Sequence, residues 1–165
     1  MTSLCSGESA SGLYPFASVQ MMDKIIRMAE KNLEEDIISV PHVETMALMC
    51  ESALYLSVIS SAKALITIST LGSTPRILAT YRGNIPIVAA CTNTKILNRA
   101  MLYYSNYPIL IEHPVRETEP VFHAIEKQLK DQGLVKKGDI MVFVFGYPVH
   151  GKHRTNTIRR WVVDK

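Results

Sequence analysis

The sequence predicts an α/β fold in which helices cover both faces of a largely parallel sheet. Between residues 64 and 163, short apolar runs alternate with segments of helical periodicity. The runs are apolar throughout, which is typical of strands buried on both faces in parallel sheets. A length of 165 residues suits one compact domain with a short appendage, and a hydrophobic content of 47% excludes a disordered chain.

The first 36 residues predict a loop, one helix and a linker. Residues 6–12 are rich in serine and glycine, as loops are, and Pro15 stands near the first turn of the helix. The stretch 31–36 is dense in charge and indicates a linker, with a domain boundary near residue 34. The helix carries an apolar stripe that consists of Phe16, Val19, Met22, Ile25, Ile26 and Ala29.

The rest of the chain alternates between helices and strands. Apolar spacing predicts a helix from about residue 41 to residue 62, and the last run predicts an edge strand at 157–163. Between them, buried strands are expected at 64–68, 86–90, 108–111 and 140–145. The helices expected between these strands span 75–82, 94–103 and 119–132.

A hydroxyl-rich loop, STLGSTP at residues 69–75, joins the first of these strands to the next helix, with Thr74 as the expected N-cap and Pro75 as the first helical residue. Such a junction collects free backbone N–H groups, the positive end of a helix and several hydroxyls, which together suit a phosphate. It also follows the carboxyl end of a strand, where open α/β sheets bind ligands. The alternative is a loop that only caps the helix, since the spacing and lysine of a Walker A loop are missing. The candidate phosphate-binding residues are Ser69, Thr70, Gly72, Ser73 and Thr74.

A basic segment follows the fourth buried strand. Its positive charges exceed the net charge of +3 of the whole chain, so the remainder is close to neutral; they belong to Lys152, Arg154, Arg159 and Arg160. A basic loop that contains glycine can close over a second phosphate, and the alternative is a solvated loop at the edge of the sheet. The candidate residues of this loop are Gly151, Lys152, His153 and Arg154. Nucleic acid is not expected as a partner, because aromatic residues are few here and no recognition motif is present.

The sequence offers no constellation of a nucleophile, a base and an oxyanion site, so the residues predict a chain that binds a small molecule rather than transforming it. Its three cysteines, Cys5, Cys50 and Cys91, and its five histidines lack metal-ligand spacing, so we expect reduced buried thiols and no metal site. No apolar run approaches the roughly 18 residues of a membrane span, and no signal segment follows Met1. We therefore expect a cytoplasmic protein without a membrane partner.

Several motifs, in order along the chain, resemble those of one enzyme family. Residues 4–15, LCSGESASGLYP, are similar to its LSGETAxGxYP segment, and residues 81–89, YRGNIPIVA, to its YRPxxPIIA segment. Residues 62–66, AKALI, follow its SAKAIV pattern, and residues 136–139 and 155–159, KKGD and TNTIR, match its KKGD and TNTMR elements. Over essentially its whole length the chain thus resembles the C-terminal portion of pyruvate kinase.

The resemblance implies a division of the chain into three parts. Residues 1–33 correspond to the last loop and helix of a truncated TIM-barrel catalytic domain, and residues 34–40 to a linker. Residues 41–165 correspond to the C-terminal effector-binding and oligomerisation domain, a three-layer domain with a mostly parallel, mixed five-stranded sheet. In the family, an edge strand and a helix of that domain help to form the homotetramer. The apolar stripe of the first helix would face the absent barrel, so we expect it to be exposed, docked on a neighbouring molecule or packed back onto the C-terminal domain.

The resemblance also implies a function. The full-length enzyme transfers phosphate from phosphoenolpyruvate to ADP with Mg and K, but the catalytic residues and the ligands of both ions lie upstream of this chain, which we therefore expect to be inactive alone and without a cofactor. In the family, the C-terminal domain takes part in allosteric regulation: the loop that matches residues 69–74 holds one phosphate of a sugar bisphosphate, and the loop that matches residues 148–154 closes on the ligand. Thr70 and Ser73 stand where the family often has charged residues. The segment 114–122 is shorter than in animal enzymes, and the tryptophan and arginine that the family contributes there have no counterpart, since Val121 or its neighbours stand instead. We therefore expect a phosphorylated effector other than fructose 1,6-bisphosphate; the alternative is a stand-alone structural or interaction domain that has lost effector binding.

Overall fold

A computed structural model describes residues 6–31, 45–111, 117–149 and 154–164 of the chain. The chain divides into two compact units, Met1–Asp36 and Ile37–Lys165, which are described separately. The assignment of the first unit to a catalytic barrel stays a prediction. Among the described residues, no helix combines the length and the apolar character that a membrane span requires.

The first unit contains the helices α1 (Gly7–Ser11) and α2 (Pro15–Lys31). The expectation of a loop over residues 6–12 is therefore wrong, because Ala10 donates its N–H to the carbonyl of Ser6 and closes a helical turn. The Glu8 carboxylate accepts the N–H of Tyr14 at 2.8 Å, which satisfies a donor at the start of α2. Within this unit, the apolar stripe of α2 is exposed at Phe16, Val19, Ile25 and Ile26.

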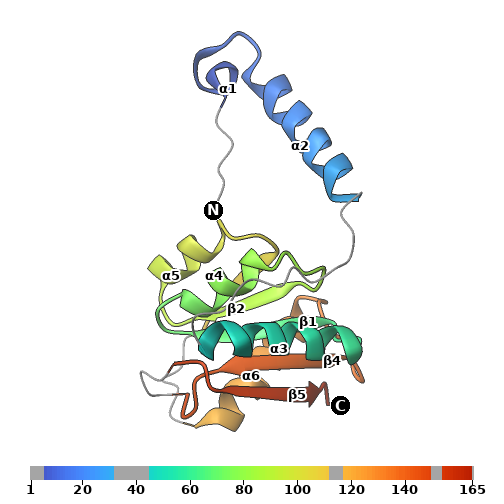
Figure 1. The fold of residues 1–165 in the computed structure, drawn as a ribbon, viewed down its shortest axis with the longest axis vertical. Helices are drawn as coiled ribbons and strands as arrows, with labels where there is room; N and C mark the ends of the chain where they lie inside the picture. Colours follow the sequence, from blue (N-terminus) through green and yellow to red (C-terminus); the bar gives the residue numbers. More distant parts are fainter. Residues whose placement is uncertain (1–5, 32–44, 112–116, 150–153, 165) are drawn as a thin grey trace. The chain divides into compact units, whose positions relative to one another are not determined.

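The second unit follows the predicted alternation of helices and strands (Figure 1). Most boundaries shift by one to three residues, because the ends depend on local turns; Ser61, for example, has φ of 51° and lies beyond the last helical turn of α3. The elements are α3 (Thr45–Ile59), β1 (Ala64–Ser69), α4 (Ser73–Thr80), β2 (Ile87–Cys91), α5 (Thr94–Ala100), β3 (Asn106–Leu110), α6 (Thr118–Asp131), β4 (Ile140–Phe145) and β5 (Thr157–Val162).

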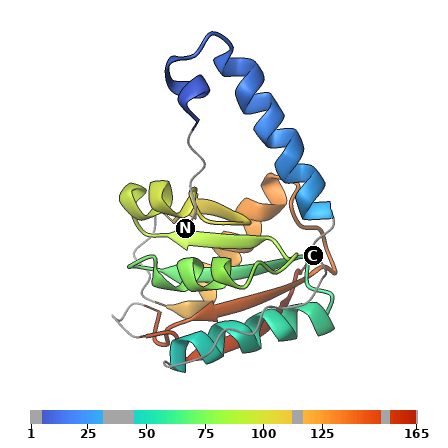
Figure 2. The same cartoon turned by 45° about the horizontal axis from the view of Figure 1, so that its top comes forward.

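The five strands form one mixed sheet in the order β3-β2-β1-β4-β5 (Figure 2). Strands β1 to β4 pair in parallel, whereas β5 is antiparallel to β4, with Phe145 opposite Thr157. This arrangement confirms the expected α/β fold and places β3 and β5 at the two edges. The carboxyl ends of β1 and β4 lie at the same end of the sheet, where the two candidate loops begin.

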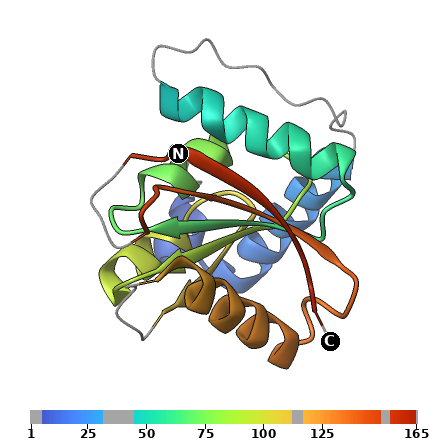
Figure 3. The ribbon, with the colours of Figure 1, turned by 90° about the horizontal axis from the view of Figure 1, so that it is seen from below.

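Helices cover both faces of the sheet, as Figure 3 shows for α3 and α6. Alternate residues of β1 point to opposite faces, so Leu65 packs against α3 and α4, while Ile66 packs beneath α6. Helix α5 covers the remaining part of the α3 face, where Ala100 packs on Ala89 and Cys91. The sheet therefore forms the middle of three layers.

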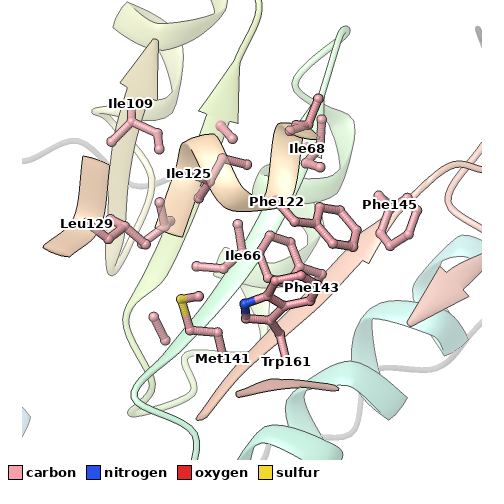
Figure 4. Packing of buried hydrophobic residues seen from close by; sticks show 14 of the residues in the cluster. Ile66, Ile68, Ile109, Phe122, Ile125, Leu129, Met141, Phe143, Phe145 and Trp161 are labelled. Atoms are coloured by element: carbon pink, nitrogen blue, oxygen red, sulfur yellow. The ribbon is translucent and has the colours of Figure 1, made fainter. Parts of the chain in front are cut away.

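An aromatic cluster dominates the core beneath α6 (Figure 4). Phe122 of α6 stacks on Phe143 of β4 with ring centroids 4.2 Å apart. Its edges meet Phe145 and Trp161, with centroid distances of 5.2 Å and 5.5 Å. Trp161 belongs to β5, so this cluster holds the antiparallel edge strand against α6.

Candidate functional site

The loop between β1 and α4 is a closed turn. Ser69 ends the buried strand, and its Oγ accepts the N–H of Gly72 at 2.8 Å. Gly72 has φ of +77°, a left-handed conformation that a side chain would strain. Helix α4 begins immediately afterwards, at Ser73. The turn therefore directs the start of the helix back over the end of β1.

The assignment of Thr74 as N-cap and Pro75 as first helical residue is wrong. The N-cap residue is Gly72, and Thr74 lies inside the first turn of α4. The helix begins earlier because the Ser69 hydroxyl already satisfies the N–H of Gly72. By helix geometry, the N–H groups of Ser73 and Thr74 have no carbonyl partner within α4, so the turn still presents donors at a positive helix end.

Thr155, within the basic segment, contacts this turn directly. The hydroxyls of Thr74 and Thr155 lie 2.8 Å apart and form a hydrogen bond between residues 81 positions apart in the sequence. Both side chains are buried, with exposed fractions of 4% and 7%. Sequence reasoning missed Thr155 as a site residue, because a single threonine carries no local signal of a distant partner. Arg154 precedes Thr155 and is exposed.

The base of the second candidate loop is held by a single side chain. Asn156 accepts the N–H of Tyr147 at 2.7 Å through Oδ1 and donates to the carbonyl of Tyr147 at 3.1 Å through Nδ2. Its own N–H binds the carbonyl of Phe145 at 3.1 Å. Arg154 is the one candidate of this loop that the structure describes, since Gly151, Lys152 and His153 lie outside the described residues.

A cavity of about 490 Å³ lies between the start of α6 and the start of β5. Its charged lining residues are Glu117, Glu119 and Arg159. The Arg159 guanidinium forms an ion pair with Glu119 and lies over the ring of Trp161, 5.0 Å from its centroid. The positive charge of Arg159 is therefore compensated. The other lining residues are Thr118, Pro120, Phe145, Tyr147, Pro148 and Thr157.

The described part of the chain holds no group of three or more potential metal-binding side chains. Burial raises the pKa of Cys50 to about 12 and that of Cys91 to about 11, so both thiols stay protonated at neutral pH. Their burial confirms the sequence expectation for these two cysteines, while Cys5 lies outside the described residues.

The fold and this turn define a three-layer α/β domain with a hydroxyl-rich helix start beyond its central strand. The family profile described as "Pyruvate kinase, alpha/beta domain" matches residues 47–159. The chain therefore belongs to the pyruvate kinase family and contains its α/β domain.

Curated relatives agree with this assignment. The chain is 32% identical to a pyruvate kinase of Debaryomyces hansenii over 94% of its own length and 33% of the relative. It is 30% identical to a pyruvate kinase of Geobacillus stearothermophilus over 98% of its length and 28% of the relative. A pyruvate kinase of Lactococcus lactis is 32% identical over 94% of the chain and 32% of the relative. The chain thus spans about a third of the length of these relatives.

Proposed function

We propose that this chain is the C-terminal regulatory part of a pyruvate kinase, which binds a phosphorylated effector and contributes to a homotetramer. In the full-length enzyme, the activity would be the glycolytic transfer of phosphate from phosphoenolpyruvate to ADP in the cytoplasm, with Mg and K bound by residues upstream of this chain. The family profile and the relatives support this role for the chain as a whole.

The proposed effector site is the turn at 69–74. Ser73 and Thr74 offer backbone N–H groups at the start of α4, and the hydroxyls of Thr70 and Ser73 add donors on its accessible side. Gly72 is buried and permits the left-handed φ of +77° that brings Ser73 and Thr74 to the start of α4. This donor set suits the oxygens of one phosphate group.

The observation that carries the proposal is the hydrogen bond between Thr74 and Thr155. It joins the basic segment to the proposed phosphate-binding turn at residues 69–74, called the phosphate turn below. Arg154 is the residue directly before Thr155, so its backbone lies one residue from this contact. Among the described residues, Arg154 has no carboxylate partner. Its guanidinium is therefore available to a phosphate, to which arginine binds through charge-assisted hydrogen bonds.

The neighbouring cavity supports a ligand with a single phosphate. Thr157 lines it and follows Thr155 by two residues, so the cavity begins within about 7 Å of chain from the contact with Thr74. Its walls carry Glu117 and the ion pair between Glu119 and Arg159, whose charges compensate each other, so the net charge of the lining is negative and disfavours a second phosphate. A sugar monophosphate would place its hydroxyl-bearing body here and its phosphate on the turn.

Calorimetric titration of the 165-residue chain tests this site. We expect glucose 6-phosphate to bind more tightly than fructose 1,6-bisphosphate, and glucose to give no heat. Binding that is tighter for the bisphosphate would contradict the proposed role of the cavity. The absence of heat and of a thermal shift with every phosphate at millimolar concentration would refute the effector site and favour the stand-alone interaction domain.

Two arginine variants separate a local contact from general electrostatic attraction. Arg154→Ala should weaken binding of glucose 6-phosphate about tenfold, the effect of losing one charge-assisted hydrogen bond. Arg160→Ala is the matched control, because Arg160 is also exposed but lies in β5, beyond the contact with Thr74. Equal losses in both variants would show that only the net charge matters.

The proposed subunit interface consists of the outer face of α3 and the free edge of β5. Tyr55 and Ile59 of α3 are exposed, and α3 packs beside β5, where Val162 is also exposed. An edge strand has unpaired N–H and C=O groups on its outer side, and a second copy can satisfy them by strand pairing. The apolar helix face beside this edge would be covered by the same contact.

Sedimentation velocity of two tyrosine variants tests the interface. Tyr55→Glu should shift the chain toward monomer, because it buries a charge in the proposed contact. Tyr107→Glu is the matched control: Tyr107 is 55% exposed against 61% for Tyr55, but it lies on β3 at the opposite edge. An unchanged sedimentation coefficient for Tyr55→Glu would refute the interface.

The chain alone is proposed to be inactive. A coupled assay for ATP formation from phosphoenolpyruvate and ADP should show no activity above buffer. Measurable turnover by the purified chain would overturn this part of the proposal and point to a self-sufficient enzyme.

A further inference from the structure

We propose that Thr155 is a positioning residue, which holds Arg154 at the phosphate turn through its hydrogen bond to Thr74. This inference rests on the proposed function, since it concerns how the same anion site is assembled. It assigns to Thr155 a role in ligand affinity without direct contact between its side chain and the ligand.

The first argument is the cost of leaving either hydroxyl without its partner. Thr74 and Thr155 are nearly completely buried, and their hydroxyl oxygens are 2.8 Å apart. A buried hydroxyl without a hydrogen bond is unfavourable, because it has lost water and gained nothing in return. The bond therefore fixes the backbone of Thr155 against the first turn of α4 in the absence of a ligand.

The second argument is that Thr155 lies between an anchored residue, Asn156, and the arginine that is proposed to bind phosphate, Arg154. Asn156 is anchored to Tyr147 and Phe145 by three hydrogen bonds, so the chain after Thr155 is fixed to the end of β4. Thr155 is thus the residue next to Arg154 whose side chain is held by a hydrogen bond. Arg154 itself is exposed and has no carboxylate partner among the described residues. No ion pair within that part of the chain therefore holds its side chain in place.

The consequence is an arginine whose placement is set before the ligand binds. Holding a binding group in position in advance raises affinity, because less conformational entropy is lost on binding. Without the hydroxyl of Thr155, Arg154 would remain in the chain but would no longer be held at the turn. The affinity for phosphate then falls even though every group that touches the ligand is still present.

Titration of inorganic phosphate into four proteins tests the inference: the wild type, Thr155→Val, Arg154→Ala and the double variant. Thr155→Val removes the hydroxyl at nearly unchanged volume, and we expect it to weaken phosphate binding about tenfold, as Arg154→Ala does. The double variant should bind no more weakly than either single variant, because Arg154 contributes only while Thr155 holds it. Thr155→Ser should restore wild-type affinity.

Thr80→Val is the control for removal of a threonine hydroxyl, since Thr80 ends the same helix and its hydroxyl donates to the carbonyl of Ile77 within that helix. It should leave phosphate affinity unchanged. Thermal unfolding of each variant identifies loss of the fold. If Thr155→Val does not fold, Thr74→Val removes the same hydrogen bond from its other partner and keeps the backbone N–H of residue 74, and unchanged phosphate affinity in that variant would refute the positioning role.

The outcomes separate this inference from the proposed function. If the wild type binds no phosphate, the anion site itself is refuted. If the wild type binds and Thr155→Val binds equally well, the site stands and the positioning role is refuted. Independent effects of the two substitutions, multiplied in the double variant, would also refute it, because Arg154 would then act without Thr155.

Discussion

Replacing Glu126 by glutamine tests how the last strand is held on the domain. Glu126 of α6 is 3% exposed, and its Oε2 accepts the indole N–H of Trp161 at 2.7 Å. Its Oε1 accepts the ammonium of Lys130 and the backbone N–H of Asp164, the latter at 3.1 Å. Lys130 also donates to the carbonyl of Asp164 at 2.7 Å. One buried carboxylate thus connects α6 to β5 and to the chain that follows it.

The expected loss is about 2–3 kcal/mol in the free energy of unfolding. A hydrogen bond to a charged group contributes about 1.5–3 kcal/mol, and glutamine replaces one acceptor oxygen by an N–H₂ group that faces a donor. The loss stays below the roughly 3–5 kcal/mol of a fully buried ion pair, because the Lys130 side chain is 29% exposed and can return to water.

Urea denaturation at pH 7 measures this change, and the fluorescence of Trp161, the one tryptophan in the sequence, reports it directly. Glu119→Gln is the matched control, since Glu119 lies seven residues earlier on α6 and its ion pair with Arg159 is exposed. It should cost less than about 1 kcal/mol. An equal loss in both variants, or no loss in Glu126→Gln, would refute the argument from burial.

The pH dependence follows from the same contacts. Burial alone raises the pKa of Glu126, but the hydrogen bonds from Lys130, Trp161 and Asp164, together with the charge of Lys130, outweigh it and lower the pKa below 4.5. The folded state therefore binds this proton more weakly than the unfolded state. The contribution to stability is complete above pH 4.5 and is lost as the pH falls through the folded pKa. Glu126→Gln should remove this part of the acid destabilisation.

Three further predictions concern the core and the phosphate turn. Phe122→Ala should lower the free energy of unfolding by about 3–5 kcal/mol in urea, and a loss below 1 kcal/mol would contradict its central packing. Gly72→Ala should lower the free energy of unfolding by about 1–2 kcal/mol, because φ is +77° and a Cβ would lie 3.3 Å from Ile96. The same variant should weaken phosphate binding, and unchanged affinity would exclude the turn as the site. The thiols of Cys50 and Cys91, whose pKa values are raised to about 12 and 11, should resist iodoacetamide at pH 8 until the protein unfolds. Peptide mapping measures the labelling, and labelling of either thiol in the native protein would contradict this prediction.

The sequence predicted the layers of the domain well because burial on both faces leaves an apolar run. The run expected at 64–68 is β1, Ala64–Ser69, and the helix expected at 119–132 is α6, Thr118–Asp131. The start of α4 was not predicted, because the choice between Gly72 and Thr74 as N-cap depends on the Ser69 hydroxyl closing the turn first. Such competition among neighbouring hydroxyls leaves no periodic pattern.

The candidate site was predictable only in its local part. The turn after β1 is recognisable, because hydroxyls and a glycine follow an apolar run. Its contact with Thr155 depends on the pairing of β5 with β4, which brings a residue from the end of the chain to the carboxyl end of the sheet. No feature of residues 69–74 indicates that partner.

The sequence also could not predict which arginines of the basic segment have a partner of opposite charge. Arg154, Arg159 and Arg160 count equally in a basic segment, yet the fold gives them different surroundings. In β5, Arg159 lies on the same face of the sheet as Trp161, where it forms an ion pair with Glu119 of α6 and lies over the ring of Trp161. Arg154 precedes the strand and keeps its charge unpaired among the described residues. Arg160 lies in β5 and is exposed. The three arginines of one basic segment therefore differ in whether their charge is compensated, and this difference follows from the place of each residue in the fold and not from the sequence pattern.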